Sequence, residues 1–171
     1  AMHRAIEKFQ VDGTVRIGEG DASDGKLFVG QKVGTGTGPQ ADVALVAIEG
    51  TSIVARGGYN ALSVLAMAEE GGFLTVPEIY MDKIAVGPEV APEAIELDKS
   101  PGENLNAVAE CMGVAVSDLQ VCLLDRPRHG QLVAAIRETG ARIQLIMDGD
   151  VNGAVAPGLA NSPVDVYMGI G

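Results

Sequence analysis

Carboxylates, glycines and arginines cluster where four predicted strands end. The four loops are Gly18-Glu19-Gly20-Asp21, Glu49-Gly50-Thr51, Asp125-Arg126-Pro127-Arg128-His129 and Asp148-Gly149-Asp150. Ligands of α/β proteins bind beyond the carboxyl ends of the strands, so side chains in such loops can reach one ligand. Carboxylates bind hard divalent cations, and arginine donates two parallel hydrogen bonds to a phosphate group. Together the four loops predict a site for a divalent cation and a phosphorylated ligand.

Each of these loops also has an ordinary structural interpretation. An acidic turn such as 148–150 is most often a solvated turn or a helix N-cap. Arg126 and Arg128 belong to a residue type that usually lies on the surface, and Glu19 fits the tip of a hairpin. His129 is equally compatible with a general acid, a polar residue at a helix start and a second phosphate donor. The functional interpretation therefore depends on the combination of loops.

A run of alternating glycine and threonine at 34–38 precedes Pro39. A phosphate-binding P-loop needs a lysine and an ensuing helix, and neither follows this run. We therefore expect a flexible hairpin at 34–38.

The chain changes character along its length. Apolar or alternating segments flanked by glycine predict four strands in the first half, at 14–17, 26–29, 43–48 and 61–67. Beyond residue 100, helices at 101–112, 130–138 and from 150 alternate with strands at 119–124, 143–147 and 164–168. Ser100-Pro101-Gly102-Glu103 is a capping box that begins the first of these helices. The β-α-β-α-β series predicts a parallel sheet.

Two lobes follow from this change of pattern. The segment 86–100 carries two prolines in G-P-E-V-A-P-E-A and has no clear periodicity. We therefore expect a strand-rich metal-binding lobe at 1–90 and an α/β sugar-phosphate-binding lobe at 91–171, each of them partial.

Charge and composition argue against several functions. The formal net charge of −11 over 171 residues opposes binding to nucleic acid and to anionic membranes. No apolar run approaches the roughly 20 residues that a membrane span requires. Cys111 and Cys122 lack metal-site spacing and are expected to be buried free thiols, which favours a reducing, cytoplasmic location. The expected partner is a small molecule.

Both ends of the sequence are typical of a fragment. Residues 1–9 have the pattern of the last turns of an amphipathic helix, and the chain stops directly after the predicted strand at 164–168. We therefore expect a piece of a longer protein that is truncated at both ends.

Six motifs together resemble the class II fructose-1,6-bisphosphatases, which belong to the lithium-sensitive, metal-dependent phosphatases. The motifs are I-G-E-G-D at 17–21, V-G-x-K-V-G-T-G-T-G-P at 29–39, I-E-G-T at 48–51, Y-M-D-K at 80–83, D-R-P-R-H at 125–129 and D-G-D-V at 148–151. Their order and spacing match over essentially the whole chain. The resemblance implies an α/β (α+β) layered sandwich of the sugar-phosphatase type, phosphate-ester hydrolysis, and a homo-oligomer at full length.

The resemblance also implies roles for individual residues. Glu19 and Glu49 would be catalytic carboxylates that bind Mg²⁺ or Mn²⁺, and the Thr51 hydroxyl would orient the attacking water. The implied substrate contacts are Gly50, Thr51, Tyr80, Arg126, Pro127, Arg128, Asp148, Gly149 and Asp150. The implied reaction removes the 1-phosphate of fructose 1,6-bisphosphate, with sedoheptulose 1,7-bisphosphate as a second substrate.

The sequence departs from the family pattern at one central place. Val46-Ala47 stands where family members have an Asp-Pro pair whose carboxylate bridges the metals. Further family metal ligands are expected before residue 1 and beyond residue 171, which leaves Glu19 and Glu49. If the metals are nevertheless held by this chain, Asp21 and Asp42 are the first other ligands to test.

Three hypotheses of function remain open at this point. The first is an enzyme, a fructose-1,6-bisphosphatase domain whose other parts belong to a longer protein. The second is a catalytically impaired module that keeps the sugar-phosphate loops. The third is an assembly role, which only exposed strand edges would favour.

Overall fold

The computed structural model describes residues 1–20, 23, 26–74, 77 and 79–171, which form two compact units. The N-terminal unit comprises residues 1–49 and 62–78, and the C-terminal unit comprises residues 50–61 and 79–171. Each unit has one four-stranded sheet with helices, which confirms the predicted α/β (α+β) class. The sequence placed the boundary between residues 90 and 91. The units divide earlier because a strand at 82–86 pairs within the second sheet.

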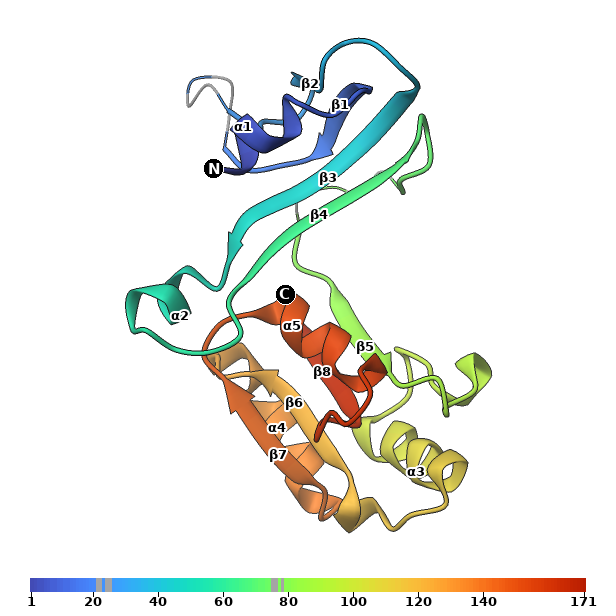
Figure 1. The fold of residues 1–171 in the computed structure, drawn as a ribbon. Coiled ribbons are helices and arrows are strands. Elements are labelled where there is room, and N and C mark those ends of the chain that lie inside the picture. Colours follow the sequence, from blue (N-terminus) through green and yellow to red (C-terminus); the bar gives the residue numbers. More distant parts are fainter. Residues whose placement is uncertain (21–22, 24–25, 75–76, 78) are drawn as a thin grey trace. The chain divides into compact units, whose positions relative to one another are not determined.

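A mixed sheet forms the N-terminal unit (Figure 1). Its elements are α1 (Met2–Ile6), β1 (Asp12–Ile17), β2 (Lys32–Val33), β3 (Gln40–Glu49) and β4 (Leu62–Glu69). The strand order is β2-β1-β3-β4, in which only β1 and β3 are parallel. Ile6 of α1 packs against Val15, Val43 and Leu45, which are all buried. The strands predicted at 14–17, 43–48 and 61–67 are thus confirmed as β1, β3 and β4.

The strand predicted at 26–29 does not form. Leu27 adopts a positive φ of 63°, and the amide of Gln31 donates to the carbonyl oxygen of Phe28 at 3.0 Å. The chain therefore turns at this point, and the short strand β2 follows it. Leu27 is nevertheless buried in the core. The apolar pattern at 26–29 thus includes one core residue, Leu27, whereas Val29 is exposed, and it did not predict the backbone conformation.

The hairpin expected at 34–38 is also wrong. β2 and β3 lie on opposite sides of β1, so the loop between them crosses β1 instead of joining neighbouring strands. Gly34 and Gly38 have φ angles of 87° and 113°, and a Cβ there would lie 2.4 Å from Val11 O and 2.2 Å from Gln10 O. Glycine is therefore needed for close packing of this loop on the preceding backbone.

A second mixed sheet forms the C-terminal unit. Its helices and strands are α2 (Thr51–Ala55), β5 (Asp82–Val86), α3 (Pro101–Met112), β6 (Gln120–Leu124), α4 (Gly130–Glu138), β7 (Arg142–Ile146), α5 (Asp150–Val155) and β8 (Val166–Ile170). Short 3-10 turns occur at η1 (Pro92–Ala94), η2 (Val116–Asp118), η3 (Pro127–His129) and η4 (Ala156–Gly158). The strand order is β5-β8-β6-β7, and β6 is parallel to both β7 and β8. The predicted parallel β-α-β-α-β arrangement is confirmed, with β5 added as an antiparallel edge strand.

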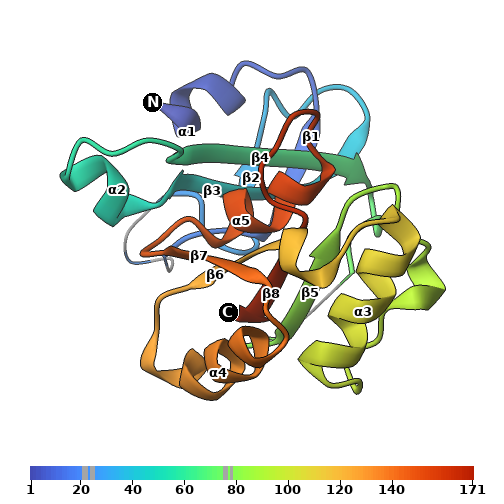
Figure 2. The same ribbon diagram turned by 90° about the horizontal axis from the view of Figure 1, so that it is seen from below.

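Helices cover both faces of this second sheet (Figure 2). Leu105 and Val108 of α3 and Ile136 of α4 pack with Val121 of β6 in one core cluster. Tyr167 of β8 packs on the other face, in a second cluster that Ala154 of α5 contacts. The parallel strands are thus buried on both sides, as expected for a βαβ arrangement. This arrangement places the ends of β6, β7 and β8 at one edge.

The capping box predicted for α3 is present. The amide of Ser100 donates to Glu103 Oε2 at 2.9 Å, and the amide of Glu103 donates to Ser100 Oγ at 3.3 Å. Both cysteines are free thiols, but only Cys122 is buried, and the expectation that Cys111 is buried is wrong. Cys111 lies in the last turn of α3 on its exposed side. Among the described helices, none has the length and apolarity to cross a membrane.

Candidate functional site

The two predicted metal ligands stand at the carboxyl-terminal ends of neighbouring strands in the N-terminal sheet, and β3 runs five residues beyond Ala44, its last residue paired with β1. Glu19 follows β1 and Glu49 ends β3, and these strands are parallel neighbours. Within the described parts of the chain, no group of three or more His, Cys, Asp or Glu side chains is placed to hold a metal ion. Mg²⁺ requires near-octahedral oxygen ligation. The described carboxylates therefore do not fit a complete Mg²⁺ or Mn²⁺ centre, and Asp21 lies outside the described residues.

Val46 and Ala47 belong to the body of β3. Val46 pairs with Val64 of β4, and the next pair is Glu49 with Leu62, so β3 carries a bulge between them. Ala47 packs against the core cluster, and its carbonyl oxygen accepts a hydrogen bond of 2.9 Å from Ser63 Oγ. Two apolar side chains thus precede Glu49 where a bridging carboxylate would be needed.

Asp42 has a structural role, which argues against its use as an alternative metal ligand. Its carboxylate accepts hydrogen bonds of 2.7 Å from Arg16 Nε and from the amide of Gly71. The Arg16 side chain is the largest cause of a lowered pKa for Asp42. Asp42 also lies near the start of β3, seven residues before Glu49, which is about 23 Å along an extended strand.

A hydrogen-bonded contact joins the loop after β3 to the loop after β7. The amide and the hydroxyl of Ser52 donate to Asp148 Oδ2 at 3.1 and 2.7 Å. The Ser52 hydroxyl is the largest cause of a lowered pKa for Asp148. Two loops that the sequence placed in one site are therefore in contact within the C-terminal unit. Ser52 was missed as their link, although a hydroxyl directly after Thr51 was a usable signal.

Replacing Ser52 with alanine is expected to lower the melting temperature at pH 7, because one net hydrogen bond contributes about 0.5–1.5 kcal/mol. The pKa of Asp148 is lower when folded, so this contribution is present at neutral pH and is lost as the pH falls below the ordinary value of 3.8. The difference in melting temperature between parent and Ser52→Ala should therefore shrink between pH 5 and pH 3.

Thr51→Ala is the control for this pH series, because Thr51 is an exposed hydroxyl residue of the same helix. Its difference from the parent should not change with pH. A gap for Ser52→Ala that is equally large at pH 3 and pH 7 would show that the ionised Asp148 is not its source.

Glycines begin both short helices at these loops. Gly50 precedes α2 with a φ of 90°, and Gly149 precedes α5 with a φ of 89°. A side chain at either position would be strained, and a Cβ would lie 2.9 Å (Gly50) or 3.2 Å (Gly149) from Ile53 Cδ1.

Asp150 follows Gly149, and its Oδ1 is buried without a hydrogen-bond partner among the described residues. Burial, with the Asp150 charge as a smaller cause, raises the pKa of Cys122 to about 11.

The loop after β6, which we call the arginine loop, carries Arg126 and Arg128, and both side chains donate hydrogen bonds to backbone carbonyl oxygens. Arg126 Nη1 donates to the carbonyl oxygen of Asp125 at 2.9 Å. Arg128 Nε and Nη2 donate to the carbonyl oxygen of Ile170 at 2.9 and 2.8 Å. Among the described residues, neither arginine has a carboxylate within 4.0 Å. No close ion pair in the described part of the chain therefore offsets either guanidinium, although Arg126 acts at longer range on Asp148, whose pKa it helps to lower.

Tyr80 lies against this loop. The guanidinium carbon of Arg128 is 4.8 Å from the centre of the Tyr80 ring, which is the geometry of a cation–π contact. Tyr80 is itself 72% exposed. Two residues that the sequence assigned to the substrate, 48 positions apart in the chain, are thus neighbours, whereas their role as substrate contacts remains a prediction.

His129 is not accessible for the acid or phosphate-donor role that the sequence left open. Its ring is buried, with 1% of its surface exposed. Nδ1 lies 2.8 Å from the carbonyl oxygen of Leu124, and Nε2 accepts a hydrogen bond of 2.9 Å from the amide of Ile170. Both ring nitrogens are therefore occupied by the backbone.

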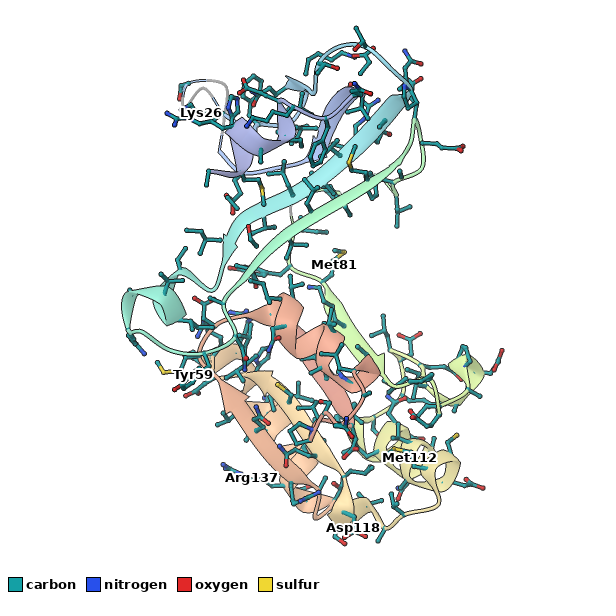
Figure 3. The ribbon with its side chains drawn as sticks, viewed as in Figure 1. Lys26, Tyr59, Met81, Met112, Asp118 and Arg137 are labelled. Atoms are coloured by element: carbon teal, nitrogen blue, oxygen red, sulfur yellow. The ribbon has the colours of Figure 1, made fainter. Side chains whose placement is uncertain are left out.

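Two of the predicted substrate contacts, Asp148 and Arg128, line separate pockets of the C-terminal unit. Asp148 and Ser52 line the first, together with Gln144 of β7 and Tyr59. Figure 3 shows Tyr59 in the loop after α2. Arg128 lines the second, together with residues that include Lys83 and Lys99. Lys83 is the lysine of the Y-M-D-K motif, so the motif itself was the signal for this further cation.

Comparison with known proteins places these motifs in a family. A family model described as bacterial fructose-1,6-bisphosphatase, glpX-encoded, matches residues 1–171. The chain belongs to this family. A D-fructose 1,6-bisphosphatase class 2/sedoheptulose 1,7-bisphosphatase of Synechococcus sp. (strain RCC307) is 43% identical over 172 residues, covering 100% of this chain and 51% of the relative.

Proteins of the same name from other organisms give similar values. The relative from Prochlorococcus marinus (strain NATL1A) is 41% identical over 172 residues, covering 100% of this chain and 51% of the relative. The one from Trichodesmium erythraeum (strain IMS101) is 40% identical over 184 residues, covering 100% of this chain and 53% of the relative. The chain thus spans about half the length of the curated relatives it matches.

Proposed function

We propose that this chain supplies the sugar-bisphosphate-binding loops of a metal-dependent phosphatase that removes the 1-phosphate of fructose 1,6-bisphosphate. Family membership over residues 1–171 supports this proposal. The relatives are named for fructose 1,6-bisphosphate and for sedoheptulose 1,7-bisphosphate, so the longer sugar is proposed as a second substrate.

The observation that carries the proposal is the set of contacts that Arg126 and Arg128 make. Backbone carbonyl oxygens hold both side chains, and the described residues place no carboxylate against either. An arginine that is oriented but not neutralised is suited to binding a phosphate group, to which it donates charge-assisted hydrogen bonds. We propose that these arginines bind the phosphate that is not hydrolysed.

The loops around Gly50 and Gly149 would receive the rest of the substrate. Carboxylates accept hydrogen bonds from sugar hydroxyls. Asp148 and Asp150, which follow β7, would accept such bonds from the sugar. Glycine at 50 and 149 keeps the backbone open to a ligand. Glu19 and Glu49 would contribute to binding Mg²⁺ or Mn²⁺, and such a cation would neutralise phosphate charge and lower the pKa of a bound water. For the Thr51 hydroxyl, the orientation of the attacking water stays a prediction.

A second candidate is a module that binds sugar bisphosphates without turning them over. The packing of Val46 and Ala47 within β3 favours it, because it leaves the described carboxylates short of a complete metal centre. Both candidates use the same binding loops and differ only in hydrolysis. A reducing, cytoplasmic location and a homo-oligomeric full-length protein are part of the proposal, and the two free thiols support the location.

A calorimetric titration tests the proposed function. Fructose 1,6-bisphosphate should bind the chain, and free fructose, which lacks both phosphates, should not. Equal or absent heats for the two sugars would reject a phosphate-binding role for this chain.

A further inference from the structure

His129 connects the ends of two parallel strands. The carbonyl oxygen of Leu124, at the end of β6, can only accept a hydrogen bond, so the Nδ1 atom 2.8 Å away carries the proton. The amide of Ile170, at the end of β8, can only donate, so the Nε2 atom 2.9 Å away is unprotonated. The surrounding backbone thus requires the neutral Nδ1–H tautomer of a fully buried ring.

Ile170 connects this histidine to Arg128. Its amide donates to His129, and its carbonyl oxygen accepts both the Nε and the Nη2 hydrogen bonds of Arg128, at 2.9 and 2.8 Å. His129 and Arg128 are also consecutive residues of the turn η3. His129 is therefore connected to Arg128 both through the chain and through the backbone of Ile170, whose carbonyl oxygen accepts from the guanidinium.

The anchoring by Ile170 leaves Arg128 able to bind an anion. A guanidinium has five N–H donors. Two of them bond to Ile170, which leaves three, and a neutral carbonyl oxygen does not cancel the positive charge. Tyr80 packs on the guanidinium from one side. Ordering a long side chain costs conformational entropy, so an arginine that is ordered beforehand binds phosphate more tightly.

We infer that His129 is a positioning residue, which holds the backbone at Ile170 through its amide and thereby orients the Arg128 guanidinium, bonded to the Ile170 carbonyl oxygen, for a phosphate group of the ligand. The inference rests on the proposed function of Arg128 and adds the residue that determines its geometry. His129 does not itself touch the ligand, because both ring nitrogens are bonded to the backbone and the ring is buried.

Two substitutions of His129 separate positioning from general stability. His129→Gln can keep one donor and one acceptor, whereas His129→Leu leaves Leu124 O and Ile170 N–H unpaired. Titration with fructose 1,6-bisphosphate should show about tenfold weaker binding for His129→Leu, the loss expected when one charge-assisted contact is misplaced, and a clearly smaller change for His129→Gln. Ile136→Ala, in the same helix-bearing core, is the control for lost stability and should bind like the parent.

A double-mutant comparison makes the inference falsifiable. In the Arg128→Ala background, His129→Leu should cause no further loss of affinity, because the group that it positions is gone. An additional loss of similar size in that background would overturn the inference. If Arg128→Ala alone leaves affinity unchanged, the proposed function of Arg128 fails instead.

A spectroscopic measurement covers the case in which the leucine variant does not fold. The ¹⁵N chemical shifts of the His129 ring should show the neutral Nδ1–H tautomer in the parent protein, and adding fructose 1,6-bisphosphate should leave it unchanged. The Nε2–H tautomer, or a ring that changes tautomer when the sugar binds, would contradict a fixed link between Leu124 and Ile170.

Discussion

Replacing Arg126 and Arg128 together with alanine is expected to weaken the binding of fructose 1,6-bisphosphate by well over tenfold. Each hydrogen bond to a charged group contributes about 1.5–3 kcal/mol, and the two guanidinium groups are the cations that the loop after β6 presents. Their contacts with backbone oxygens mean that little else needs to rearrange when they bind phosphate. Calorimetric titration of the parent and the double variant measures the effect.

A matched pair of arginines controls for the loss of charge. Arg137 at the end of α4 and Arg142 at the start of β7 are exposed and lie away from the arginine loop in sequence. Their double alanine variant has the same net charge as the Arg126/Arg128 variant, so a general electrostatic effect would appear in both. Equal weakening by the two double variants would refute a specific phosphate site at Arg126 and Arg128.

Restoring the family pair by Val46→Asp with Ala47→Pro should tighten Mn²⁺ binding by at least about tenfold, since even residues that only support a metal ligand change affinity by 10–100-fold. The added carboxylate would stand three residues before Glu49 at the end of β3. Hydrolysis should return only in a longer protein that also supplies the remaining ligands. The affinity is measured by titration with Mn²⁺, in which electron paramagnetic resonance reports the concentration of the free ion.

Val64→Asp is the matched control for this restored pair. Val64 pairs with Val46 across β3 and β4, so the same charge is added one strand away. It should not tighten Mn²⁺ binding. If both variants tighten it equally, added negative charge alone explains the gain, and position 46 is not a ligand position.

The C-terminal unit was more predictable than the N-terminal one. The capping box at Ser100 and the stripe of Leu105 and Val108 define α3 through local sequence, because caps and helical periodicity are properties of neighbouring residues. β5 was missed because its pairing with β8 joins residues 80 to 88 positions apart, which no local pattern records. The turn at Leu27 was missed for a related reason, since an apolar residue can be buried from a turn as well as from a strand.

In the candidate site, too, local sequence predicted some features, and contacts between distant segments determined the others. Loop chemistry after the strands identified Asp148 and Arg128, the family resemblance added Tyr80, and the structure brings Tyr80 to Arg128. What the sequence did not reveal is which partner each side chain takes. Ser52 donates to Asp148, and Arg128 donates to the carbonyl oxygen of Ile170. Both contacts join segments that are distant in the sequence. His129 was ambiguous because burial, not residue type, decides its role.

Phosphate release from fructose 1,6-bisphosphate by the 171-residue chain, with and without Mn²⁺ or Mg²⁺, tests the central claim most directly. The account predicts that the chain binds the sugar but releases phosphate far below an ordinary enzymatic turnover of roughly 1–10³ s⁻¹, while a longer family protein with the full ligand set turns over in that range. Turnover of that ordinary size by the 171-residue chain would contradict the account. The metals would then be held by residues that we interpret as turns, with Asp21 the first to replace.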